Sequence, residues 1–193
     1  SNDWDELIGP EDPPFSAHAF LRDLETSGCA TPETGWLPQF LMARSSGGEA
    51  VGALPLYLKN HSNGEYIFDH GWADAAHRAG LPYYPKLIAC TPFTPAVGRR
   101  FLIRQDVDQA QVRRALAQAA EGVAQARGAT GVHLLFLSPD EQDTLSTEGF
   151  LPRHTLQFQW RNAGYPTFES YLATLKSKRR AQIIRERRES VGS

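Results

Sequence analysis

An uninterrupted apolar run, Val132–Leu137, constrains the fold of this chain more than any other stretch of its sequence. Such a run is typical of a strand that is buried on both faces. Before it, Asp106 and Gln109 predict a capping box for a helix that ends at Gly128. The apolar stripe of this helix comprises Val112, Leu116, Ala119, Ala120 and Val123. After the run, Ser138–Glu141 predicts a second capped helix with proline at its first position. Strands that alternate with helices predict an α/β fold.

The first third of the chain predicts a helix followed by a β-hairpin. Ser16 is the expected N-cap of the helix, with Phe15 and Phe20 forming a hydrophobic staple, and Gly28 is its expected end. The hairpin strands are expected at Trp36–Ala43 and Ala50–Leu58, around a turn at Ser45–Gly48. They contain Pro38 and Pro55, which cannot donate a hydrogen bond to a sheet ladder.

Residues His154–Arg161 alternate between apolar and polar side chains, which predicts a half-buried strand. Its two faces are expected to carry Leu156, Phe158 and Trp160 on one side and Thr155, Gln157 and Gln159 on the other. Thr167 is the expected N-cap of a final amphipathic helix. Two shorter segments, Lys86–Thr91 and Arg100–Ile103, are further strand candidates.

The composition of the chain bounds its class. Its 193 residues are 41% hydrophobic and 22% charged, as in an ordinary globular protein. No apolar run approaches the roughly 20 residues that a membrane helix needs. The first five residues are acidic and lack the apolar core of a secretory signal, and Cys29 and Cys90 are too far apart to suggest a disulfide framework. We therefore expect a cytoplasmic protein without a membrane span.

The charge is distributed unevenly. The net charge is −2, but Lys176–Glu189 holds seven basic and two acidic residues and so carries +5, which leaves −7 on the rest of the chain. Such a segment indicates either an anionic partner or a solvated helix. A nucleic-acid-binding tail is one version of the first alternative, although the acidic remainder of the chain argues against it.

The stretch Glu65–Pro95 lies between two predicted strands and has no regular pattern of its own. Long irregular connections in compact domains are usually functional loops or disordered linkers. This one is rich in Trp, Tyr and Phe, which is unlike a disordered segment. It therefore predicts the wall and floor of a substrate site.

Several motifs of the chain resemble the FemAB-like family of predicted N-acyltransferases. They are Pro32–Trp36, Gly64–Asp69, Gly71–Ala75, Gly80–Lys86, Pro92–Pro95, Ser177–Arg180, Ile183 and Arg185–Arg187. In addition, the unit from Val132 to Phe150 is similar to the second half of the GNAT N-acyltransferase fold, in which a Gly-Phe step joins a helix to a strand. The resemblance covers nearly the whole chain. It implies an α/β fold with a GNAT-like mixed β-sheet flanked by helices and a C-terminal basic helical extension.

The resemblance also implies a domain organisation and an activity. Residues 1–165 would form a GNAT-like N-terminal lobe, and residues 166–193 the helical start of a second lobe that this chain does not complete. Family relatives named Fem transfer amino acids from aminoacyl-tRNA to an amine of a peptidoglycan precursor. The implied function is therefore N-acyl transfer to a small-molecule or peptide amine. The alternative is a non-catalytic lobe that recognises an amine-bearing or anionic partner.

The expected acyl donor is a substrate rather than a firmly bound cofactor. The pyrophosphate-binding pattern of acetyl-CoA enzymes is absent ahead of the helix at Asp106. Acyl-CoA, an acyl carrier and aminoacyl-tRNA all stay open as donors. The residues expected to hold an anionic donor are Lys178, Arg179 and Arg180, with a solvated helix as the alternative.

Two carboxylates, Asp69 and Asp74, are the expected catalytic residues, because acyl transfer needs an amine that is oriented and deprotonated. The expected substrate-binding residues are Trp72, Tyr83, Tyr84, Lys86 and Phe93. Each of these assignments has a structural alternative. Asp69 could cap a helix near Gly71 while Asp74 is exposed, Trp72 could belong to the core, and Lys86 could be a solvated strand end.

Two further groups of residues suggest chemistry that we do not expect. His70, Asp74 and His77 fall on one face of a helix at a spacing that a metal site could use, but they lack a fourth ligand and the resemblance implies no metal. Cys90 has no accompanying histidine motif, so we expect a buried strand residue rather than a nucleophile.

Overall fold

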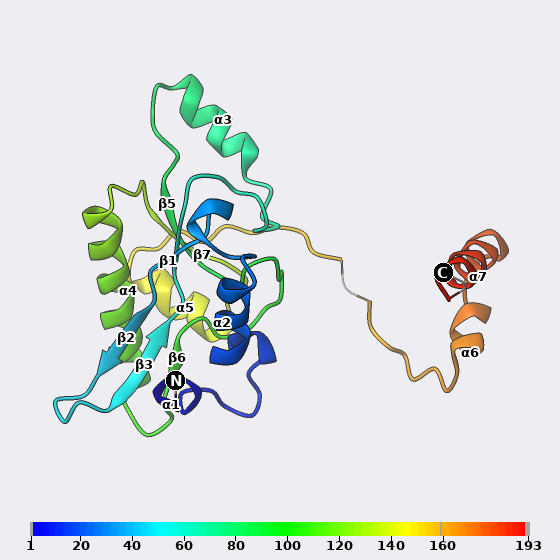
Figure 1. Ribbon diagram of the computed structural model, residues 1–193, viewed down its shortest axis with the longest axis horizontal. Helices are drawn as coiled ribbons and strands as arrows, with labels where there is room; N and C mark the ends of the chain where they lie inside the picture. The colour runs from blue at the N-terminus through cyan, green and yellow to red at the C-terminus, as the bar shows by residue number, and fades with distance from the viewer. Residues whose placement is uncertain (1, 159, 192–193) are drawn as a thin grey trace. The chain divides into compact units, whose positions relative to one another are not determined.

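The computed structural model describes residues 2–158 and 160–191, and it divides the chain into two compact units, residues 1–153 and 154–193 (Figure 1). The helices of the first unit are α1 (Asn2–Asp5), η1 (Pro14–Ser16), α2 (His18–Thr26), η2 (Pro32–Thr34), α3 (His70–Arg78), α4 (Gln109–Ala126) and α5 (Pro139–Thr147). Its strands are β1 (Leu37–Pro38), β2 (Leu41–Arg44), β3 (Ala50–Leu54), β4 (Tyr57–Lys59), β5 (Lys86–Ala89), β6 (Leu102–Ile103) and β7 (Val132–Leu134). The predicted α/β class is confirmed.

The strands form two short sheets that share one long hairpin. One sheet has the order β1-β4-β5-β7, with β5 and β7 parallel and the other pairs antiparallel, and the second has the order β2-β3-β6. The pairs β2–β3 and β1–β4 confirm the predicted hairpin. Its prolines sit where a missing N–H does little harm, because Pro38 lies in the edge strand β1 and Pro55 in the break between β3 and β4.

The strand alternation gives the first sheet two different faces. On one face, Leu87 and Ala89 join the largest apolar cluster, which includes Leu116 and Ala120 of α4. On the other face, Ile88 packs in a separate cluster whose members include Trp36, Tyr57 and Cys90. Because successive side chains point to opposite faces, Lys86 shares the face of Ile88 and lies away from α4. In Figure 1, α3 projects from the end of this sheet.

Helix α4 begins later than predicted. Asp108, not Asp106, is its N-cap, and the Asp108 carboxylate accepts a hydrogen bond from the Gln111 amide at 3.0 Å. Asp106 is instead held by an ion pair with Arg104, so it is not available for capping. The buried stripe also differs in detail, since it comprises Leu116, Ala117, Ala120 and Ala124. Gly128 follows the helix in the left-handed conformation, which agrees with the prediction that it ends the helix.

The predicted cap of the first long helix is wrong, although its staple is confirmed. Ala17 is the N-cap of α2, and Ser16 belongs to η1, where its carbonyl accepts a hydrogen bond from the Trp4 indole at 2.9 Å. The preceding 3-10 turn therefore displaces the start of the helix. The rings of Phe15 and Phe20 are 5.5 Å apart, as the staple requires.

Two strand predictions need correction, one in the first unit and one at the start of the second. Strand β7 is shorter than Val132–Leu137 and only half-buried, because it lies at the edge of its sheet and Phe136 adopts φ of 54°, which ends the extended backbone. The predicted strand His154–Arg161 does not form in the residues that are described, among which Phe158 is 91% exposed. Gln159 lies outside the described residues. An alternating pattern makes a strand only where a partner edge pairs with it.

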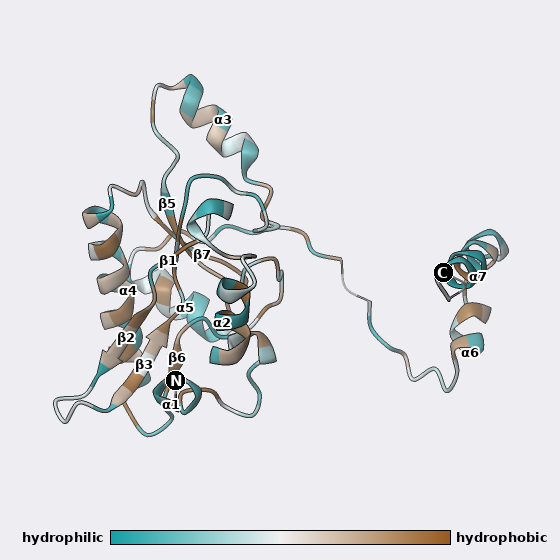
Figure 2. Ribbon diagram, viewed as in Figure 1, coloured by the Kyte–Doolittle hydropathy of each residue, from teal (hydrophilic) through white to brown (hydrophobic). Residues whose placement is uncertain are grey.

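The second unit consists of α6 (Phe168–Ala173) and α7 (Ser177–Val191) with the segment that precedes them. Thr167 caps α6 as predicted, accepting a hydrogen bond from the Ser170 amide at 3.1 Å. Helix α7 is mostly hydrophilic (Figure 2). Across the described part of the chain, none of the helices has the length and apolar character that crossing a membrane requires.

Candidate active site

Two buried lysines lie side by side at one end of the two central strands of the first sheet. Lys59 of β4 and Lys86 of β5 are direct partners in the antiparallel register, and both are 0% exposed. Like charges opposite one another destabilise a sheet, and burial adds a desolvation cost. The sheet therefore needs anionic partners at this point.

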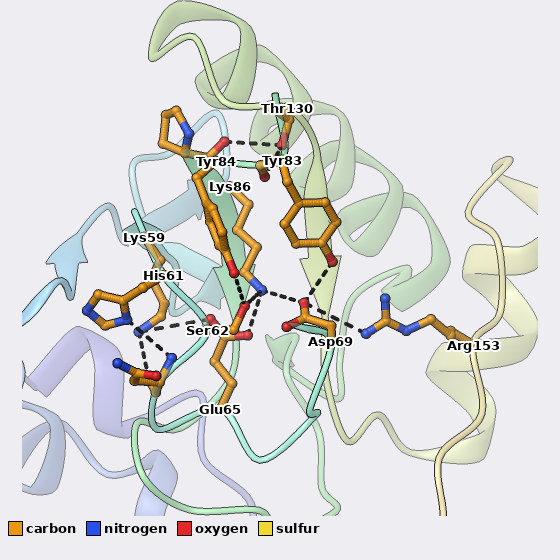
Figure 3. A network of polar contacts seen from close by, with 12 residues as sticks. Lys59, His61, Ser62, Glu65, Asp69, Tyr83, Tyr84, Lys86, Thr130 and Arg153 are labelled. Atoms are coloured by element: carbon orange, nitrogen blue, oxygen red, sulfur yellow. Dashed lines mark hydrogen bonds and ion pairs between the residues drawn. The ribbon is translucent and has the colours of Figure 1, made fainter. Parts of the chain in front are cut away.

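The loop after β4 provides those partners. The Lys86 Nζ donates hydrogen bonds to Glu65 Oε2 at 2.7 Å, to Asp69 Oδ2 at 2.7 Å and to Ser62 Oγ at 2.8 Å (Figure 3). An ammonium group has three N–H donors, so Lys86 is fully satisfied. Glu65 and Asp69 are each only 2% exposed. The loop thus delivers two carboxylates to one buried cation.

An unusual backbone conformation directs both carboxylates inward. Between Glu65 and Asp69, Tyr66 has φ of 58° and Phe68 has φ of 55°, both in the left-handed region. The side chains of these two residues are exposed by 46% and 76%. A non-glycine residue in this region costs on the order of 1 kcal/mol, and such strain tends to occur at functional sites.

Lys59 has a different environment from Lys86. Its Nζ donates to the Asn63 carbonyl at 3.1 Å, lies 3.3 Å from the ring centroid of Trp36, and is 3.9 Å from Glu65 Oε1. Burial lowers the pKa of Lys59 to about 8, although the Glu65 charge acts in the opposite direction. Lys59 therefore exchanges its proton much closer to neutral pH than an ordinary lysine does.

The two carboxylates differ in their proton affinity. Burial tends to raise the pKa of Asp69, but hydrogen bonds from Lys86 and Tyr83 outweigh it and hold this pKa far below its ordinary value. Burial raises the pKa of Glu65, only partly opposed by its hydrogen bond with Lys86. Asp69 is therefore a fixed anion, whereas Glu65 can take up a proton more readily.

Each carboxylate has one oxygen without a hydrogen bond in the described part of the chain, although Glu65 Oε1 keeps its 3.9 Å ion pair with Lys59. Within the described residues, Glu65 Oε1 and Asp69 Oδ1 are buried and accept no hydrogen bond. A buried acceptor without a donor costs about 1–3 kcal/mol. Buried polar groups are nearly always satisfied, so such atoms point to a ligand that supplies N–H or O–H groups.

The outer side of the site is made of tyrosines. Tyr83 donates its hydroxyl proton to Asp69 Oδ2 at 2.7 Å, and the Tyr84 hydroxyl shares a hydrogen bond with Ser62 at 2.7 Å. Thr130 fixes their backbone by donating to the Tyr83 carbonyl at 2.7 Å. Burial and the hydrogen bond to Asp69 raise the pKa of Tyr83 to about 12, so it stays a donor at neutral pH.

A cation and a tryptophan complete the rim. Arg153 Nη2 lies 3.9 Å from Asp69 Oδ2, and its guanidinium is 5.7 Å from the ring centroid of Trp72. The Arg153 side chain is 36% exposed, and Trp72 is 63% exposed. His133 lies behind Tyr83 with ring centroids 6.0 Å apart, and burial lowers its pKa to about 4, which keeps it neutral.

These residues form a continuous path from the sheet to the surface. We call them the Lys86 cluster, and its members are Lys59, Ser62, Glu65, Asp69, Tyr83, Tyr84, Lys86 and Arg153 (Figure 3). The cluster combines fixed charges, unused acceptor oxygens and an exposed cationic rim. It can hold a ligand that carries N–H groups and an anionic group.

Comparison with known proteins identifies the family of the chain. A family model described as peptidoglycan biosynthesis/recognition matches residues 1–192. The chain belongs to the FemAB-like family. No curated protein and no solved structure matches it. The FemAB-like assignment agrees with the resemblance seen in the motifs and connects the chain to peptidoglycan.

The FemAB-like chain brings together some of the site residues predicted from sequence. Asp69, Tyr83, Tyr84 and Lys86 meet in the Lys86 cluster, and Trp72 reaches it through Arg153. Two alternatives are contradicted, because Lys86 is not solvated and Trp72 is not core. The third holds in part, since Asp69 occupies the N-cap position of α3 and Asp74 is exposed, but the Asp69 side chain makes no capping hydrogen bond.

The other predicted residues lie elsewhere. Phe93 packs on Trp36, with ring centroids 5.4 Å apart, behind the lysines. Asp74 is exposed on α3. Lys178 and Arg179 are exposed on α7 in the second unit, where Arg180 donates to the Leu175 carbonyl at 3.1 Å.

Sequence reasoning missed half of the cluster. The missed residues are Lys59, Ser62, Glu65 and Arg153. The signal for Lys59 and Lys86 was present, since both are lysines in otherwise apolar strands. Glu65 then stands out as a carboxylate between them in the chain. Arg153 follows the last helix of the unit and gave no such signal.

The remaining reactive residues do not join the cluster. His70, Asp74 and His77 are all exposed on α3, and the described residues contain no group of three or more His, Cys, Asp or Glu placed to hold a metal ion. Cys90 is 1% exposed, which confirms that it is buried, and burial raises its pKa to about 12. Such a thiol is a poor nucleophile.

Proposed function

We propose that the protein is an N-acyltransferase that moves an acyl or aminoacyl group onto an amine of a peptidoglycan precursor, and that the Lys86 cluster holds this amine. The observation that supports the proposal is the unused Oδ1 of Asp69, a buried acceptor on a carboxylate kept ionised by Lys86 and Tyr83. The FemAB-like family assignment supports the link to peptidoglycan.

The charges of the cluster favour a nucleophilic amine. An amine attacks an acyl carbon only when it has lost its extra proton, and nearby positive charge lowers the pKa of an ammonium group. The cluster has a net positive charge, because three cationic side chains, those of Lys59, Lys86 and Arg153, face two carboxylates. In this proposal the amine forms the new bond to the acyl carbon. The donor's leaving oxygen or sulfur departs and is protonated.

The two carboxylates have different roles in this scheme. Asp69 is a weak base, because its pKa is far below its ordinary value, so it orients the amine by accepting an N–H. Glu65 has a raised pKa, and a general base works best when its pKa approaches the working pH. Glu65 is therefore the proposed proton acceptor.

The donor is proposed to be an anionic carrier of the acyl group, either acyl-CoA, an acyl carrier or aminoacyl-tRNA. The basic side chains Lys178 and Arg179 are exposed on α7 and are the proposed contacts for its phosphates. No firmly bound cofactor is required by this scheme.

The test is a transfer assay on the full-length protein with acetyl-CoA or charged tRNA as donor and a stem peptide with a free amine as acceptor, read by the mass increase of the peptide. We expect Asp69→Asn to lower the rate roughly 100-fold, the size typical of removing a preorganised polar contact. Asp143→Asn, an exposed change on α5, serves as the matched control. A folded Asp69→Asn variant with an unchanged rate would refute the proposal.

A second candidate function is recognition without catalysis. The strongly lowered pKa of Asp69 favours it, since a fixed anion binds an amine well but removes a proton poorly. In that case the same peptide raises the melting temperature of the protein, as a ligand of the native state does, without any gain in peptide mass. Asp74→Asn, assayed in the same way, shows whether Asp74, the other carboxylate predicted from sequence, contributes to binding or transfer.

A further inference from the structure

The Lys86 cluster has more cations than anions. Three cationic side chains, those of Lys59, Lys86 and Arg153, face two carboxylates, those of Glu65 and Asp69. A ligand that brings only an ammonium group would increase this excess of positive charge, which comes from the exposed Arg153. A ligand whose amine is accompanied by its own carboxylate would not. The charge balance therefore discriminates between two kinds of amine.

Arg153 is placed to contact such a carboxylate. Its Nη2 is 3.9 Å from Asp69 Oδ2, beyond hydrogen-bond distance, because that oxygen already accepts from Lys86 and Tyr83. A guanidinium group has five N–H donors in a planar fork that matches a carboxylate. The Arg153 side chain is 36% exposed, and the Trp72 ring supports its guanidinium at 5.7 Å.

Asp69 is placed to contact the amine. It is 2% exposed, and its Oδ1 accepts no hydrogen bond from the residues that are described. Asp69 and Arg153 are neighbouring side chains, so the Asp69 Oδ1 acceptor lies near the exposed guanidinium group of Arg153. The two groups of an α-amino acid, one donor and one acceptor on a single carbon, complement this pair.

We propose that the site selects an amine that carries a carboxylate on the same carbon, with Asp69 accepting a hydrogen bond from the amine and Arg153 donating to the carboxylate. This inference rests on the proposed function, which puts the substrate amine in the Lys86 cluster. Among stem peptides, it favours an amine-bearing residue of the meso-diaminopimelate type over lysine, whose side-chain amine has no neighbouring carboxylate.

Calorimetry on the full-length protein tests the proposal with two tripeptides, L-Ala-γ-D-Glu-meso-diaminopimelate and L-Ala-γ-D-Glu-L-Lys. We expect the first to bind at least about tenfold more tightly, since a hydrogen bond to a charged group has about that effect on affinity. Free meso-diaminopimelate, measured in parallel, shows whether the ligand is a peptide or a free amino acid. Equal affinities for the two tripeptides, or no binding of either, would overturn the proposal.

Arginine variants identify the group responsible for the preference. Arg153→Met should abolish it, whereas Arg153→Lys should retain part of it, because lysine keeps the charge but lacks the fork. Arg78→Met, an exposed change at the end of α3, is the matched control and should leave the preference intact. A preference that survives in Arg153→Met contradicts the assignment.

Failure of this inference can be told apart from failure of the proposed function. Equal rates of acyl transfer to the two tripeptides would leave the transferase function intact and overturn the specificity. A binding preference for the diaminopimelate peptide, without transfer from any donor, would overturn the transferase function and leave the specificity in place.

Discussion

The first unit contains two buried charge clusters, and they differ in how completely their polar atoms are satisfied. In one, Glu141 is 1% exposed, and its oxygens accept from the amides of Arg100 and Phe101 at 2.8 Å and from the amide and hydroxyl of Ser138. Arg100 donates in turn to backbone carbonyls, including that of Leu135 at 2.8 Å. In the Lys86 cluster, two carboxylate oxygens accept no hydrogen bond from the described residues.

The difference separates a structural device from a candidate site. The Glu141 carboxylate joins the start of α5 to the chain before β6, and it has no acceptor capacity left for a ligand. The Lys86 cluster retains such capacity beside the exposed side chains of Arg153 and Trp72. Burial of charge is thus common to both clusters, and the acceptor oxygens without hydrogen bonds distinguish the candidate site.

The largest expected effect is on stability, from Lys86→Met. This change leaves Glu65 and Asp69 buried without their cation, and removing one partner of a buried ion pair costs about 3–5 kcal/mol. Urea denaturation measures the loss, and Lys176→Met, an exposed lysine on the second unit, should change stability by less than about 0.5 kcal/mol. A loss below about 1 kcal/mol for Lys86→Met would contradict the central place of this lysine.

The next largest expected loss of stability comes from Glu141→Ala, which tests the cluster around Glu141 and Arg100. It leaves the buried amides of Arg100 and Phe101 without an acceptor, at an expected cost of about 3 kcal/mol in the free energy of unfolding. Binding of the diaminopimelate tripeptide by the folded fraction should be unchanged. Glu121→Ala, an exposed change on α4, is the control. Loss of binding in folded Glu141→Ala would break the distinction between the clusters.

A smaller effect concerns the pH dependence of stability. The pKa of Lys59 is about 8 in the folded protein and 10.5 in its ordinary state, so between these values the unfolded chain binds more protons. The free energy of unfolding should therefore rise with pH across this window, at no more than about 1.4 kcal/mol per pH unit.

The measurement compares wild type with Lys59→Met, which removes the titrating group but keeps an unbranched side chain against Trp36. The difference in stability should move in favour of the wild type from pH 8 to pH 10.5. A change in the opposite direction would mean that Glu65 raises the pKa of this lysine more than burial lowers it.

The smallest expected change in stability belongs to Trp72→Ala. Trp72 is 63% exposed, and exposed positions usually tolerate substitution within about 0.5 kcal/mol. Loss of the ring beneath Arg153 should nevertheless weaken binding of the diaminopimelate tripeptide about two- to fivefold, the size of an exposed cation–π contact. Unchanged affinity would remove Trp72 from the binding rim.

Local signals predicted much of the fold because each depends on neighbouring residues. The turn of the hairpin, the capping box of Ser138 and Glu141 and the cap at Thr167 all involve residues a few positions apart. The same reasoning misplaced the start of α4, where two aspartates compete and an ion pair with Arg104 engages the first of them.

The site was predicted less completely because its contacts are distant in sequence. Lys86 is 17 residues from Asp69, 21 from Glu65 and 24 from Ser62. An isolated lysine at a strand start resembles a solvated strand end until a carboxylate approaches it. Only the pairing of β4 with β5 brings the second lysine opposite the first.

By itself, the sequence determined the α/β class, the hairpin and the family, and it predicted a site in the stretch Glu65–Pro95. Strand periodicity, caps and family motifs are properties of contiguous residues, so they can be recognised without a fold. The tertiary structure alone decided that Lys59, Glu65 and Arg153 join Asp69 and Lys86. A buried charge requires partners, and which partners it finds depends on the register of the strands and the path of the loop between them.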